Sequence, residues 1–137
     1  MSQALIRQAF ETRLKTWADA QAPAIPIAWQ NVTMTPPAGR YLRAFLLPAS
    51  TGSDDLAGEH RVFRGLFQVT VVTPIGTGPG QAEQLAGQLD LLFPLTEPLA
   101  VGGLLVYLTS PMSAGPAIQE PDRYAVPVSA GYRADTI

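Results

Sequence analysis

The stretch from Arg61 to Pro94 constrains the fold most, because its hydrophobic period changes across a glycine-rich turn. Its first part alternates apolar and mostly polar side chains, which predicts a strand with Phe63, Phe67, Val69 and Val71 on one face. Three glycines and two prolines between residues 74 and 80 then break any regular ladder. Beyond them, apolar residues recur at three- and four-residue intervals, at Ala82, Leu85, Ala86, Leu89, Leu92 and Phe93. The stretch therefore predicts a strand, a turn and a helix that lies against a sheet.

The glycine turn invites comparison with phosphate-binding loops, since free N–H groups at the start of a helix attract phosphate. The spacing of Gly76, Gly78 and Gly80 is not G-x-G-x-x-G, and no Lys-Ser/Thr pair follows. Pro79 also removes one N–H group. We interpret the segment as a structural turn in which Thr77 or Gly78 leads into the helix.

Length and composition limit the possible functions. The 137 residues correspond to one domain, which we expect to span residues 1–137. Cysteine is absent, and the formal charge of -2 gives no basic surface for nucleic acid. Charged residues make up only 15%, against about a quarter in typical domains. A surface with few charges is consistent with burial against other subunits, although a Pro- and Ala-rich composition also lowers the charged fraction. No leader or membrane span is apparent, so we expect a soluble protein that is not exported.

The remaining elements follow from periodicity and from breakers. A first helix is predicted over Ser2 to Ala20, a short edge strand around Ile25 to Trp29, and a second strand over Tyr41 to Leu47. The segment from Pro48 to Glu59 is predicted to be a mobile loop. After Pro94 come a strand from Leu99 to Leu108, with a turn or bulge at its two glycines, and a loop from Ser110 to Pro121. The last strand, Tyr124 to Arg133, contains Pro127, which predicts an edge position or a bulge.

Candidate catalytic and metal-binding groups are few. His60 is the single histidine, so a zinc site or a catalytic triad would need distant carboxylates. Asp54, Asp55 and Glu59 lack the alternating pattern of a calcium loop. The aromatic residues of the predicted strands are better explained as core than as a stacking platform for single-stranded nucleic acid. We therefore expect no enzyme activity, no cofactor and no metal.

Four arginines lie on the two strands that flank the acidic loop: Arg40, Arg43, Arg61 and Arg64. This arrangement suits ion pairs between subunits at least as well as phosphate contacts. We predict that Asp54, Asp55 and Glu59 meet Arg43, Arg61 or Arg64 of a neighbouring subunit. Solvated surface charges are the alternative reading.

Several of these segments together resemble one protein family. They are IAWQNVTMTPPAGRYLRAFLLPA at residues 27–49, GLFQVTVVTPIGTGPGQAEQLAGQLDLLFP at residues 65–94 and YAVPVSAGYR at residues 124–133. The most specific parts are N-x-x-x-x-P-P-x-x-x-Y-L-R from Asn31 and G-x-x-Q-V-x-V-x-x-P-x-G-x-G from Gly65. Over almost the whole chain the sequence is similar to the tail terminators of long-tailed bacteriophages and prophages, the minor tail proteins of type U.

The resemblance implies an α+β domain, with a mixed, mostly antiparallel sheet and two main helices on one face. It also implies a homohexameric ring, formed in solution or only on assembly, that caps the tail tube, ends its polymerisation and offers a surface for head–tail joining. The expected partners are further copies of the chain, the tail-tube protein and a head–tail connector, without membrane or sequence-specific nucleic acid. The expected location is the virion tail, with assembly in the host cytoplasm. The alternatives are a connector or neck protein of similar fold and, less in keeping with the turn, a small-ligand binder.

Overall fold

The computed structural model of the chain describes residues 3–49, 52–53, 61–76, 78–95 and 97–136. In chain order its elements are α1 (Gln3–Asp19), β1 (Ile27–Trp29), β2 (Tyr41–Pro48), β3 (Gly52–Ser53), β4 (Arg61–Pro74), α2 (Gly80–Leu92), β5 (Leu99–Val101), β6 (Leu104–Leu108), β7 (Ser113–Ala114), β8 (Ile118–Gln119) and β9 (Arg123–Thr136).

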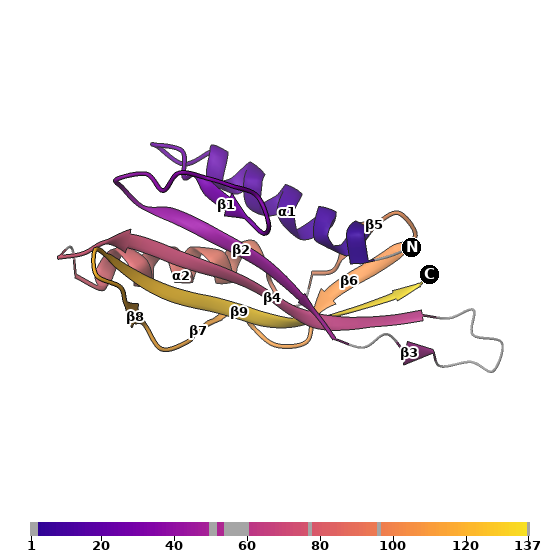
Figure 1. Cartoon of the computed structure of the whole chain (residues 1–137). Coiled ribbons are helices and arrows are strands. Elements are labelled where there is room, and N and C mark those ends of the chain that lie inside the picture. Colours follow the sequence, from indigo (N-terminus) through magenta and orange to yellow (C-terminus); the bar gives the residue numbers. More distant parts are fainter. Residues whose placement is uncertain (1–2, 50–51, 54–60, 77, 96, 137) are drawn as a thin grey trace.

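Two long antiparallel strands, β4 and β9, form the centre of the sheet and run along the molecule in Figure 1. Their register is unbroken from Val62 opposite Asp135 to Pro74 opposite Arg123. The strand order is β1-β2-β4-β9-β6-β5, and β1 joins β2 in parallel while the other pairs are antiparallel. The short β3 extends the β2 side of β4, and β7 and β8 extend the β6 side of β9. The expected mixed, mostly antiparallel sheet is confirmed.

Both helices pack on the same face of this sheet. The buried side chains of α1 and α2 belong to one hydrophobic cluster with the inward-facing side chains of β2, β4, β6 and β9. The cluster includes Phe10, Leu85, Leu46, Phe67 and Val106. This arrangement follows from the sequence, because α1 and α2 each carry one apolar stripe and the strands alternate. The predicted α+β architecture with helices on one face is therefore confirmed.

Aromatic rings hold α1 to the middle of the sheet. The rings of Phe10 and Phe67 stack with their centroids 4.4 Å apart, and the rings of Phe93 and Tyr132 lie 5.7 and 5.6 Å from that of Phe10. The Tyr132 hydroxyl donates a hydrogen bond to Gln3 Oε1 at 2.7 Å. Burial raises the pKa of this hydroxyl. These contacts fix where α1 lies on the sheet.

On the opposite face of the sheet, cover by described residues is clearest at one end. There the segment between β1 and β2 crosses it, and Met34 packs on Tyr41, Val72 and Ala125. Toward the other end of β2 the exposure of this side rises, and Leu47 is exposed. We call the uncovered end the open face. It carries Phe45, Leu47, Arg64, Leu66, Tyr107 and Arg133, which the register places on one side of the sheet.

Two sequence predictions are wrong at the C-terminal end. The segment from Ser110 to Pro121, expected to be a loop, contains β7 and β8, because β9 offers a long edge on which two-residue strands can pair. Pro127 lies neither at an edge nor at a bulge, since β9 pairs on both sides and its register with β4 is continuous. Its carbonyl accepts a bond from the Gly115 N–H at 2.7 Å. Because the N and O of one residue point to the same side of a strand, the missing N–H faces the gap between β7 and β8.

The predictions for the centre of the chain agree with the structure. The strand, turn and helix expected between Arg61 and Pro94 are β4 and α2, with Pro79 as the N-cap residue. The glycine pair after β5 is a hairpin turn, in which both Gly102 and Gly103 have positive φ. Most of the expected mobile loop, Pro48 to Glu59, lies outside the described residues. Neither described helix has the length and apolar character needed to cross a membrane.

Candidate interaction surface

The predicted interface arginines fall at different places on the sheet. Arg43 and Arg64 both lie on the face away from the helices, opposite Thr70 and Arg133 respectively. Arg61 begins β4, and its side chain is outside the described part. Asp54, Asp55, Glu59 and His60 are also outside the described residues. The proposed pairing of the acidic loop with arginines of a neighbour therefore stays a prediction.

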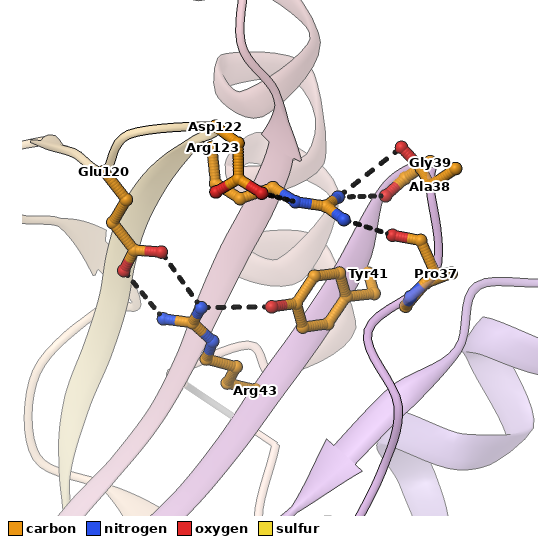
Figure 2. A network of polar contacts seen from close by, with 8 residues as sticks. All are labelled: Pro37, Ala38, Gly39, Tyr41, Arg43, Glu120, Asp122 and Arg123. Atoms are coloured by element: carbon orange, nitrogen blue, oxygen red, sulfur yellow. Dashed lines mark hydrogen bonds and ion pairs between the residues drawn. The ribbon is translucent and has the colours of Figure 1, made fainter.

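Arg43 has a carboxylate partner within its own chain. Its Nη1 donates to Glu120 Oε2 at 3.1 Å and its Nη2 to Oε1 at 3.2 Å, as Figure 2 shows. Nη2 also donates to the Tyr41 hydroxyl at 3.0 Å. The hydrogen bonds to Glu120 raise the pKa of Arg43, and the Arg43 guanidinium lowers the pKa of the Glu120 carboxyl. This two-pronged pair joins β2 to the turn before β9.

Arg123 secures the segment that crosses the same face. Its guanidinium donates to the backbone carbonyls of Pro37, Ala38 and Gly39, with the bond to Gly39 at 3.1 Å (Figure 2). The guanidinium carbons of Arg43 and Arg123 each lie 5.6 Å from the centroid of the Tyr41 ring. These contacts are within the range of cation–π attraction. The network is structural: it ties residues 37–39 and the β8–β9 turn to β2.

The open face combines exposed apolar side chains with two arginines that lie opposite each other on β4 and β9. Leu47 and Leu66 lie directly opposite each other on β2 and β4 and are 43% and 46% exposed. Arg64 lies two residues before Leu66, on the same side of β4, and is opposite Arg133 on β9. Like charges at directly opposite positions disfavour each other. Arg133 Nε donates to Asp135 Oδ1 at 2.9 Å, whereas no side-chain partner for Arg64 is found among the described residues.

The outer side of α2 carries acidic side chains beside an exposed leucine, in contrast to the arginines of the open face. Leu91 is 80% exposed, the highest value among the large apolar side chains of the described part. Asp90 precedes it and is exposed. Glu83 is also exposed and lies two turns earlier on the same side of the helix. From Pro74 to Asp122 the sequence contains five acidic residues and no Lys or Arg. Arg13 of α1 reaches the end of the helix, where it donates to the Leu92 carbonyl at 3.3 Å. We call Glu83, Gly87, Asp90 and Leu91 the α2 ridge.

Possible metal ligands are scattered over the described part of the chain. No cluster of three or more His, Asp or Glu side chains that could hold a metal ion is found there. The glycine turn borders a shallow hollow of about 270 Å³, lined by Pro74, Ile75, Gly76, Gly78, Pro79, Gln119 and Tyr124. None of these side chains is charged. The hollow therefore offers no cation to a phosphate group.

Sequence reasoning missed Glu120 and Tyr41 as partners of Arg43, and Arg123 as the residue that holds the segment 37–39. A signal was present, because Pro121-Asp122 is a turn dipeptide and its flanking residues, Glu120 and Arg123, are oppositely charged. In the structure these two residues exchange backbone hydrogen bonds across a tight hairpin. The α2 ridge was also missed, because single exposed apolar and acidic residues are common on the outer side of an amphipathic helix.

Comparison with known proteins identifies the family. A family model described as phage tail terminator protein matches residues 5–132. The chain belongs to this family. A solved structure that carries no functional name is 52% identical, has a TM-score of 0.84 and is matched over 98% of this chain and 96% of its own. No curated protein matches the chain. Membership of the tail terminator family supports a structural role in the phage tail and confirms the resemblance seen in the sequence.

Proposed function

We propose that this tail terminator caps the tail tube as a homohexameric ring, ends tail polymerisation and presents the surface for head–tail joining. The observation that carries the proposal is the family match, which extends over residues 5–132 and so includes both helices and the sheet. The open face and the α2 ridge support it, because a ring needs two different contact surfaces on each subunit. The partners are then other copies of the chain, the tail-tube protein and a head–tail connector.

The test is a polymerisation assay with purified tail-tube protein from the corresponding phage or prophage. Tubes grown alone should lengthen without limit, whereas tubes grown with this protein should stop and carry it at one end in electron micrographs. The matched control is the protein denatured by heat, added at equal concentration. Tubes that keep growing with native protein present would contradict a terminator and favour a connector that binds only finished tails.

A further inference from the structure

We propose that the α2 ridge of one copy docks on the open face of the next, with Leu91 against Leu47 and Leu66 and Asp90 beside Arg64. The inference rests on the proposed ring and specifies which surfaces form its repeated contact. The occupant of the open face is therefore a second copy of this chain.

Charge complementarity is the first argument. Arg64 lies opposite Arg133 on the open face, and the neighbouring Asp135 accepts a hydrogen bond from Arg133 and none from Arg64 in the described part of the chain. Arg64 therefore lacks an anionic partner among the described residues. The α2 ridge offers exposed carboxylates without a single cation of its own. Opposite potentials on two surfaces steer association and fix its register.

Apolar exposure is the second argument. Leu47 and Leu66 form a cross-strand pair in the open face, and Leu91 projects from the α2 ridge. Each surface thus presents a leucine contact beside its charge. A buried apolar centre with a charged rim is the usual composition of a specific protein interface.

The positions of the two surfaces are the third argument. Leu66 alternates with the buried Phe67 and therefore points away from the helices. Leu91 belongs to a helix that packs on the other face. The sheet lies between them, so they cannot meet within one chain. A contact between two different surfaces is heterologous, and repetition of it produces a ring or a filament.

Cysteine cross-linking tests this contact, because the natural chain contains no cysteine. The variant Leu66→Cys/Leu91→Cys should give, under mild oxidation, a ladder of covalent oligomers up to the closed ring. The matched control is Val32→Cys/Leu91→Cys, since Val32 is a comparably exposed apolar residue outside the open face. Cross-linking no greater than in this control would overturn the inference. Circular dichroism of the reduced variants establishes that each one folds.

Charge exchange gives an independent readout. Arg64→Glu and Asp90→Lys should each weaken association by about tenfold, and the double variant should recover most of the loss. Recovery of Arg64→Glu by Asp54→Lys, Asp55→Lys or Glu59→Lys, and not by Asp90→Lys, would overturn the assigned contact in favour of the acidic loop.

The outcomes for the contact and for the proposed function can be separated. If tubes stop at a fixed length while cross-linking stays at the control level, the terminator function is supported and this interface is contradicted. If cross-linked oligomers form but the protein has no effect on tube growth, the interface is supported and the proposed terminator function is contradicted.

Discussion

At Gly65 an added methyl group would have no room. An ideal Cβ there would lie 2.6 Å from the Leu47 carbonyl oxygen and 2.7 Å from the Tyr132 hydroxyl. The backbone oxygen cannot move without disturbing the β2–β4 pairing. We therefore expect Gly65→Ala to lower the free energy of unfolding by about 1–3 kcal/mol, measured by urea denaturation. The control is Gly87→Ala, because this exposed helical position has open space and alanine favours helix, with an expected gain of about 0.5–1 kcal/mol. Equal effects at the two glycines would contradict the steric account.

The Arg43–Glu120 pair predicts a pH dependence of stability. The pKa of Glu120 is lower in the folded chain than its usual value of 4.5, because the carboxylate accepts hydrogen bonds from Arg43. The pair therefore stabilises the fold above that usual value, and the contribution is lost as the pH falls through the folded pKa. We expect Glu120→Gln to lower the urea midpoint near neutral pH, and the difference from the wild type to shrink as the pH falls below 4.5. Glu97→Gln, at an exposed glutamate, controls for loss of one charge. A difference between wild type and Glu120→Gln that does not change with pH would contradict the assignment.

On the scale of elements, Arg123 holds the segment between β1 and β2 on the sheet. Lysine keeps the charge but lacks the planar fork that contacts three carbonyls, so Arg123→Lys should release this segment. We expect amide hydrogen exchange to rise by about tenfold in residues 31–41 and to stay unchanged in α2. Arg40→Lys is the control, since no side-chain partner of Arg40 is found among the described residues. Faster exchange in both variants would indicate a general loosening and not the loss of this contact.

The elements predicted from the sequence are those whose pattern is local. The alternation in β4 and the apolar stripe of α2 are properties of neighbouring residues, and both were found where expected. The strands β7 and β8 exist because β9 offers an edge, so two-residue sequences such as Ser113-Ala114 carried no signal. Pro127 suggested an edge strand, yet its missing N–H falls opposite a gap that only the folded sheet creates.

The interaction surface was less predictable for the same reason. The partner of Arg43 lies 77 residues away in the chain, and no local pattern connects the two. Arg64 and Leu66 were visible as alternating strand residues, but their exposure depends on which part of the face the segment 31–40 covers. The sequence placed the arginines on the two strands that flank the acidic loop. It did not indicate that Arg43 is already paired with Glu120 of the same chain.

For the whole molecule, the expected assembly state in solution follows from the two surfaces. We predict a mass near six subunits by light scattering at high protein concentration and low salt, and a lower average mass as salt is raised. The salt effect follows because the Debye length shrinks from about 10 Å at 0.1 M to about 3 Å at 1 M, which screens the attraction between Arg64 and the α2 ridge. The contact of Leu91 with Leu47 and Leu66 is not screened, so a Leu91→Ala variant should show less association at every salt concentration, whereas Arg64→Glu should differ most at low salt. A wild-type mass that is independent of both concentration and salt, at one subunit, would contradict a stable free ring. The same series repeated with tail-tube protein would then determine whether the tube supplies the surface on which the subunits meet.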